Sequence, residues 1–182
     1  MKIRKYTRIG CGLMKIAIIG SAGSGKSTLA RRIGEKLKLP VFHMDTLFWK
    51  PGWEAVSTEE LTEKHDQILK NPSWVIDGNY HKVWGKRMEA ADLIIFLDLP
   101  RATCLYRAIK RFFQYRKKTR PDMTVGCEEK LDWEFIRYIW KYPKTKRYYA
   151  IQVIELYKNR KSTIILHNKE EIDNFLAHLS YK

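Results

Sequence analysis

One segment, GSAGSGKST at residues 20–28, constrains this chain more than any other. It matches the pattern G-x-x-x-x-G-K-[ST], in which glycines let the backbone curl so that its N–H groups point at phosphate oxygens. An apolar run at residues 14–19 precedes it, and Leu29, Ile33 and Leu37 recur on one helical face after it, before Pro40. The sequence therefore predicts a buried strand, a phosphate-binding loop and a helix, in that order.

This context gives the residues of the loop their expected roles. The helix that begins at Lys26 directs its positive N-terminal end at the bound phosphates. Lys26 is expected to reach the β- and γ-phosphates of ATP, and the hydroxyl of Ser27 to bind Mg²⁺. The predicted nucleotide-binding residues of the loop are Gly20, Ser21, Ala22, Gly23, Ser24, Gly25, Lys26, Ser27 and Thr28.

The rest of the chain alternates apolar runs with helical patterns. Strands are predicted at residues 41–43, 74–76, 93–97 and 163–166, and a helical pattern at 131–157 is expected to be interrupted near Pro143. Because the strands are continuous apolar runs, they favour a parallel sheet with helices on both faces, an α/β fold.

Length and periodicity define the domain organisation. A chain of 182 residues suits a single domain, predicted over 14–182, with 1–13 as a loose N-terminal extension. Residues 114–130 have no clear periodicity and are predicted to form a lid. The three cysteines lack zinc-ligand spacing, and no apolar run reaches the roughly 20 residues of a membrane span. Reduced thiols, a cytoplasmic location and no membrane contact are therefore expected.

The net charge of +15 is concentrated in one part of the chain. Residues 101–160 contain 16 Lys and Arg against 6 Asp and Glu. The positive electrostatic field of this excess favours an anionic partner such as nucleotide phosphates or nucleic acid. A solvated basic surface would have the same composition.

A carboxylate follows one of the predicted strands. Asp77 ends the run at 74–76, at the edge of a parallel sheet where ligands gather. It is predicted to help bind Mg²⁺ with Ser27, the alternative being a turn formed with Gly78.

Several motifs together resemble a known group of proteins. The order of the phosphate loop, the D-G strand end, the strand LIIFLDLP and a basic lid resembles the nucleoside monophosphate kinases, which include adenylate and shikimate kinases. The segments MDTLFWKPGW, WVIDGNY and TRPDMTVGCEEKLD resemble the topology modulation proteins. The resemblance spans roughly residues 14–180. It implies a three-layer P-loop NTPase fold with a five-stranded parallel sheet in order 2-3-1-4-5, an ATP–Mg²⁺ site and a small basic lid.

The resemblance also implies roles for four arginines. Arg107 and Arg111 follow Pro100 at the spacing of two adenylate kinase arginines, which implies stacking on the nucleobase and clamping of phosphate respectively. Arg116 and Arg120 fall in the lid and would neutralise charge during phosphoryl transfer. Solvated basic side chains are the alternative for all four.

On the acceptor side, Asp45 stands where shikimate kinases place an aspartate that contacts the acceptor, and it could orient or deprotonate a hydroxyl. Phe48, Trp49 and Trp53 could wall the acceptor pocket, together with Asn79, or simply pack in the core. The adenylate kinase arginine after D-G is missing, which leaves the acceptor unidentified. Lys86 and Arg87 could supply a cation there or lie on a plain helix surface.

Two functions remain open at this stage. The first is an ATP–Mg²⁺-dependent phosphotransferase acting on an unidentified small molecule or nucleotide, with Lys26, Asp45, Asp77, Arg116 and Arg120 as the catalytic set. The second is a nucleotide-dependent DNA-binding regulator that affects DNA topology. No recognisable nucleic-acid-binding module accompanies the basic segment, so the first is favoured.

Overall fold

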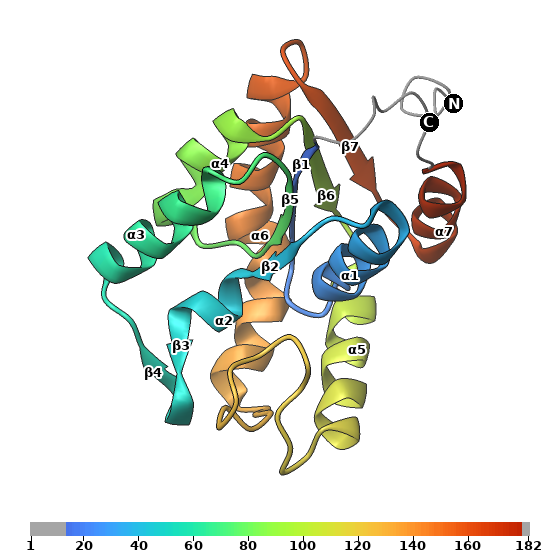
Figure 1. Ribbon diagram of the computed structural model, residues 1–182. Helices are drawn as coiled ribbons and strands as arrows, with labels where there is room; N and C mark the ends of the chain where they lie inside the picture. Colours follow the sequence, from blue (N-terminus) through green and yellow to red (C-terminus); the bar gives the residue numbers. More distant parts are fainter. Residues whose placement is uncertain (1–13, 180–182) are drawn as a thin grey trace.

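Strand β1 (Lys15–Gly20) lies at the centre of a five-stranded sheet in the computed structural model, which describes residues 14–179 (Figure 1). The strand order is β2-β5-β1-β6-β7, and all neighbouring strands are parallel. Counted along the chain, this is the predicted order 2-3-1-4-5, so the predicted fold is confirmed. The remaining strands of this sheet are β2 (Val41–His43), β5 (Trp74–Asp77), β6 (Leu93–Leu97) and β7 (Ser162–Leu166). The predicted extension at 1–13 lies outside the described residues.

Helices cover both faces of the sheet, as the apolar strands require (Figure 1). One face carries α1 (Lys26–Leu37), α5 (Arg101–Gln114) and α7 (Lys169–His178). The other carries α3 (Thr58–Leu69), α4 (Trp84–Ala90) and most of α6 (Trp133–Tyr157).

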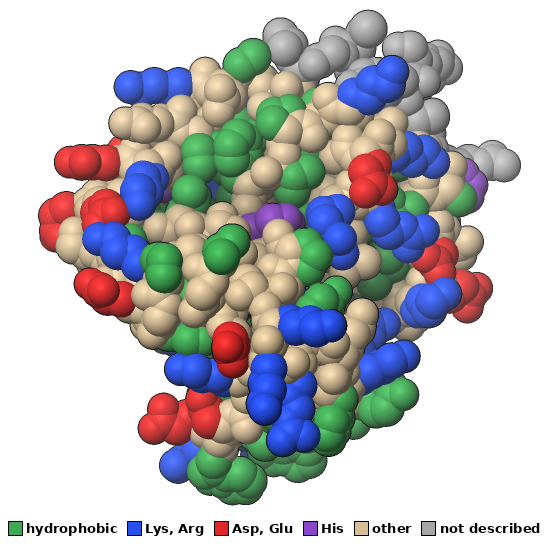
Figure 2. Space-filling model, turned by 60° about the horizontal axis from the view of Figure 1, so that its bottom comes forward, with side chains coloured by type: hydrophobic (Ala, Val, Ile, Leu, Met, Phe, Trp, Pro, Cys, Tyr) green, Lys and Arg blue, Asp and Glu red, His purple; other side chains and the backbone are tan. Residues whose placement is uncertain are grey.

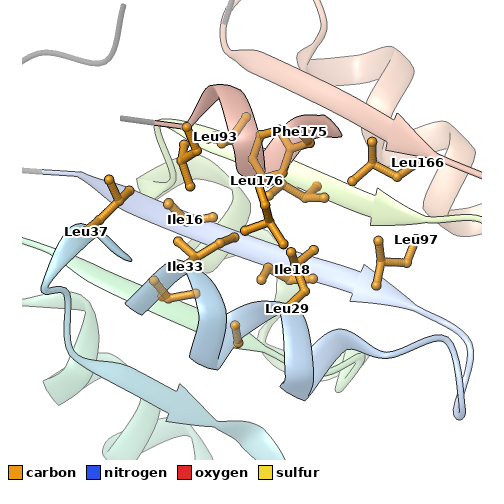
Figure 3. Packing of buried hydrophobic residues seen from close by; sticks show 14 of the residues in the cluster. Ile16, Ile18, Leu29, Ile33, Leu37, Leu93, Leu97, Leu166, Phe175 and Leu176 are labelled. Carbon is orange, nitrogen blue, oxygen red and sulfur yellow. The ribbon is translucent and has the colours of Figure 1, made fainter. Parts of the chain in front are cut away.

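Successive side chains of β1 point to opposite faces and so belong to two separate cores. Ile16 and Ile18 pack on the side of α1, whereas Ala17 and Ile19 pack on the side of α3 and α4. Figure 3 shows the first core, in which the apolar stripe of α1 contacts the sheet beneath α7. Its labelled residues are Ile16, Ile18, Leu29, Ile33, Leu37, Leu93, Leu97, Leu166, Phe175 and Leu176. This packing fixes the loop between β1 and α1 at the carboxyl edge of the sheet.

The segment between β2 and α3 forms small elements that the sequence did not predict. A one-turn helix α2 (Met44–Phe48) leads into an antiparallel hairpin of two short strands. These are β3 (Trp49–Lys50) and β4 (Glu54–Ala55), joined by a 3-10 turn, η2 (Pro51–Trp53). A second 3-10 turn, η3 (His81–Val83), follows β5 and leads into α4.

The predicted interruption at Pro143 is wrong, because α6 is one continuous helix of 25 residues that contains this proline. An internal proline removes one helical hydrogen bond and costs about 3 kcal/mol. Burial on both sides of Pro143 opposes that cost: Ile139 packs in one core, whereas Ala150 and Ile154 pack in the other. Within residues 14–179, no helix is both long and apolar enough to cross a membrane.

Candidate active site

The phosphate-binding loop connects the buried end of β1 to the first turn of α1. Gly23 and Gly25 adopt positive φ angles of 76° and 98°, which side chains rarely tolerate. A Cβ atom at Gly23 would lie 2.1 Å from the carbonyl oxygen of Cys104 on α5, so glycine is required for space as well. The ammonium of Lys26 donates to the carbonyl of Ser21 at 2.8 Å and so folds back over the loop. Burial lowers the pKa of Lys26, and the nearby carboxylates of Asp77 and Asp45 oppose this shift.

Ser27 and Asp77 meet beside this loop, as predicted for a magnesium site. The Ser27 hydroxyl donates to Oδ2 of Asp77 at 2.9 Å. Both groups offer the hard oxygen ligands that Mg²⁺ prefers, and Mg²⁺ usually takes its other ligands from waters and substrate phosphates. The pair therefore fits this ion by position and chemistry.

His43 completes the surroundings of Asp77 and was not predicted as a site residue. It ends β2 directly opposite Asp77, and its Nδ1 is hydrogen-bonded to Oδ1 of that carboxylate. Burial lowers the pKa of His43, but the hydrogen bond and charge of Asp77 outweigh burial, so the pKa lies above its usual value. The position of His43 at the end of a predicted strand, two residues before Asp45, is the sequence signal that could have identified it.

Asp45 lies in α2 and lines the same cavity as Ser27 and Asp77. The Tyr80 hydroxyl donates to its Oδ1 at 2.8 Å, and Nη2 of Arg120 donates to its Oδ2 at 3.1 Å. Its side chain is still 39% exposed, so the carboxylate can accept a further hydrogen bond from a ligand. Burial and the charge of Asp45 raise the pKa of Tyr80, which keeps its hydroxyl a donor.

The aromatic residues after Asp45 form a connected wall of this cavity. The ring centroids lie 4.7 Å apart for Phe48 and Trp49, 4.9 Å for Phe48 and Tyr80, and 5.3 Å for Trp49 and Trp53. All four residues line the cavity. The sequence left open whether Phe48, Trp49 and Trp53 line a pocket or pack in the core. In the structure they line the cavity and pack on one another.

The segment predicted to form a lid, residues 114–130 and called the lid below, is hydrogen-bonded to this aromatic segment. Thr124 donates to the carbonyl of Trp49 at 2.6 Å, and the indole N–H of Trp53 donates to the carbonyl of Glu128 at 3.0 Å. The N–H of Gly52 donates to the carbonyl of Gly126 at 3.1 Å. The lid is thus docked above Asp45.

The buried arginine of the lid, Arg120, lies close to acidic residues of the same segment. Arg120 is only 8% exposed, and its side chain lies 3.1 Å from Asp45, 3.6 Å from Glu129 and 3.9 Å from Asp122. Glu129 also pairs with Arg111 of α5 at 2.6 Å. Burial lowers the pKa of Arg120, but Asp122 and Asp45 outweigh burial and raise it.

The four predicted arginines are placed differently. Arg107 donates to the carbonyl of Ser24 in the phosphate loop at 2.9 Å, and Arg111 and Arg120 line the cavity. Arg116 is exposed and is not among the cavity-lining residues. The functional roles of these four residues stay predictions.

Asn79 lines the cavity and also binds the phosphate loop. Its Oδ1 accepts from the N–H of Gly20 at 3.2 Å, and its Nδ2 donates to the carbonyl of Gly20 at 2.7 Å. Both amide groups are therefore used to position the first glycine of the loop.

These groups surround one cavity of about 1090 Å³. Figure 2 brings this end of the molecule forward and shows Lys and Arg side chains distributed across it. The phosphate loop lines one part of the cavity, and the lid and aromatic wall line another. A volume of this size can hold a nucleotide together with a small second molecule.

Comparison with known proteins identifies the fold. No protein-family model matches the sequence, and no curated protein matches it. A shikimate kinase from Acinetobacter baumannii, solved in complex with shikimate, matches with a TM-score of 0.57 and 16% identity over 91% of this chain and 89% of that chain. A shikimate kinase from Bacteroides thetaiotaomicron has a TM-score of 0.47 and 17% identity over 91% of this chain and 95% of that chain. The first of these likenesses, together with the sheet order and the phosphate loop, shows that the chain has the P-loop kinase fold.

Proposed function

We propose that this protein is an ATP–Mg²⁺-dependent phosphotransferase that acts on the hydroxyl of a small acceptor. The observation that carries the proposal is that the phosphate loop, the Ser27–Asp77 pair and Asp45 face one cavity beneath a basic lid. A hydrolase needs no second ligand site, whereas Asp45 and its aromatic wall would serve as one in a phosphotransferase. The fold likeness to a shikimate kinase solved in complex with shikimate supports the same reaction class.

The chain's own residues supply binding and positioning. The loop N–H groups and Lys26 hold the phosphates, and Ser27 and Asp77 would hold Mg²⁺, which supplies charge neutralisation on the phosphates when bound. Asp45 orients the acceptor hydroxyl and can take its proton. Tyr80 fixes the carboxylate of Asp45 through its hydrogen bond.

The docked lid would exclude water, which otherwise competes as the phosphoryl acceptor. Arg120 lies between Asp45, which would bind the acceptor, and Glu129 of the lid. Its positive charge can there stabilise the negative charge that develops during phosphoryl transfer. Arg107 and Arg111 would bind the nucleotide from α5. The closer kinship with topology modulation proteins and the cytoplasmic location rest on the sequence and stay predictions.

The test is ADP release from ATP–Mg²⁺, screened against nucleoside monophosphates, small hydroxylated metabolites and DNA. We expect one class of small acceptor to stimulate ADP release, and Lys26→Ala and Asp45→Asn to abolish the stimulation. Lys64→Ala and Asp66→Asn on α3, which do not line the cavity, are the matched controls and should behave as wild type. Stimulation by DNA alone would instead support the nucleotide-dependent DNA-binding regulator.

A further inference from the structure

A face of α6 lies along the loop that follows β5, on the acceptor side of the cavity. Tyr138 and Lys146 stand eight residues apart on this helix and both line the cavity. Burial raises the pKa of Tyr138, and its hydrogen bond with Asn79 opposes this shift. Eight residues turn a helix about 80° beyond two full turns, so Tyr138 and Lys146 lie within one broad stripe of α6 about two turns apart.

Lys146 is a cavity-lining lysine that pairs with no carboxylate among residues 14–179. Within residues 14–179 it forms no ion pair, and its ammonium lies 6.0 Å from the ring centroid of Tyr149. By contrast, the cavity-lining Arg111 and Arg120 are paired with Glu129 and Asp45. A ligand can therefore bind Lys146 without displacing a carboxylate, whereas Arg111 and Arg120 each have one as a partner.

His81 lies beside Lys146 and also lines the cavity. Its ring centroid is 5.9 Å from that of Tyr149, the ring that Lys146 also approaches, and 4.2 Å from that of Trp84. Burial lowers the pKa of His81, and the positive charges of Lys146 and Arg87 lower it further. The two charged side chains of residues 14–179 that act on this pKa, Lys146 and Arg87, are both positive.

Arg87 adds a buried positive charge behind this wall. The sequence left open whether it lies on a plain helix surface, and the structure buries it completely, with one donor bonded to the carbonyl of Gly78 at 2.8 Å. Among the described residues, its Nε and Nη1 atoms have no hydrogen-bond partner. A desolvated charge without a bonded counter-ion favours an anion nearby, and the charge of Asp77 meets part of this requirement by opposing the effect of burial on the pKa of Arg87.

We propose that Lys146 and His81 form an anion-binding subsite, and that the acceptor therefore carries a carboxylate or phosphate group in addition to its reacting hydroxyl. The subsite begins at the residue next to Tyr80, whose hydroxyl is bonded to Asp45. One acceptor can thus present a hydroxyl to Asp45 and an anionic group to Lys146. The identification of an acceptor rests on the proposed kinase function, but the binding of an anion at this subsite does not.

The test uses the imidazole NMR signals, which are few because the chain has five histidines. Inorganic phosphate is titrated at constant ionic strength into the Lys26→Ala variant, in which the phosphate loop is weakened. The signal of His81, assigned with His81→Gln, is expected to shift saturably. Lys146→Met should weaken this binding about tenfold or more, as expected for losing a charge-assisted hydrogen bond.

Lys144→Met is the matched control, because Lys144 is an exposed lysine on the same helix and does not line the cavity. Lys146→Arg keeps the positive charge and should retain anion binding, which shows that a substitution at this position does not by itself disrupt the site. A repeat with acetate distinguishes a carboxylate site from a phosphate site. Equal binding in the Lys146→Met and Lys144→Met variants, or no saturable His81 shift with either anion, would overturn the proposal. Because ATP is absent, this result stands whatever the ADP-release assay gives.

Discussion

The substitution Asn79→Ala tests how the phosphate loop is held in place. Asn79 makes two hydrogen bonds with the backbone of Gly20, at 3.2 Å and 2.7 Å, and Gly20 is buried. Each neutral hydrogen bond contributes about 0.5–1.5 kcal/mol, and leaving a buried backbone group without a partner costs about 1–3 kcal/mol. We therefore expect the free energy of unfolding to fall by about 1–3 kcal/mol.

The same substitution should weaken nucleotide binding. Gly20 begins the loop that holds the phosphates, so freeing it adds motion that binding must suppress. If the free energy of binding becomes weaker by roughly 1.4 kcal/mol, about the contribution of one hydrogen bond, Kd for ATP–Mg²⁺ rises about tenfold. Urea denaturation measures the first effect, and calorimetric titration with ATP–Mg²⁺ measures the second.

Asn71→Ala is the matched control for this prediction. Asn71 also donates one side-chain hydrogen bond to a backbone carbonyl, that of Ile68 at 3.0 Å, but it does not line the cavity. It should lower the free energy of unfolding by about 0.5–1.5 kcal/mol without changing ATP–Mg²⁺ affinity. If Asn79→Ala bound ATP–Mg²⁺ as tightly as Asn71→Ala does, the reasoning about Gly20 would be refuted.

Three further changes test the core, the lid and the pH dependence. Ile33→Ala removes a fully buried side chain and should lower the free energy of unfolding by about 2–5 kcal/mol, measured by urea denaturation. Glu129→Gln releases Arg111 from its ion pair, so Kd for ATP–Mg²⁺ should fall, whereas the exposed neighbour change Glu128→Gln should leave it unchanged. Burial lowers the pKa of His65, so protons favour the unfolded chain below its unfolded pKa of about 6.5. The free energy of unfolding should therefore decline from pH 7 to about pH 5, and less steeply in His65→Gln.

The sequence was sufficient wherever the signal is local. The phosphate loop, its flanking strand and helix, and the cap of α3 each depend on neighbouring residues. For example, the hydroxyl of Ser57 accepts from the N–H of Glu60 at 3.1 Å, which is the N-cap contact typical of an S-x-x-E sequence such as residues 57–60. The position of Asp77 at a strand end was enough to bring it to Ser27, because parallel strands end at one edge of the sheet.

The sequence failed where tertiary packing decides. A proline normally ends a helix, yet α6 continues through Pro143 because its two halves are buried in different cores. Likewise, no periodic pattern could predict that Glu129 pairs with Arg111, because the lid has no regular structure to relate the two positions. The pairing of Asn79 with Gly20 joins residues 59 positions apart and was equally hidden.

Direct detection of a phosphorylated product tests the central claim, phosphoryl transfer to an acceptor at Asp45. The protein is incubated with ATP–Mg²⁺ and a mixture of hydroxylated small molecules, and mass spectrometry searches for a compound whose mass has increased by one phosphoryl group. We predict one such product with wild type and Asp66→Asn, at least about a hundredfold less with Asp45→Asn, and none with Lys26→Ala. A product that forms equally with Asp45→Asn, or ADP released with inorganic phosphate and no phosphorylated compound, would contradict the account.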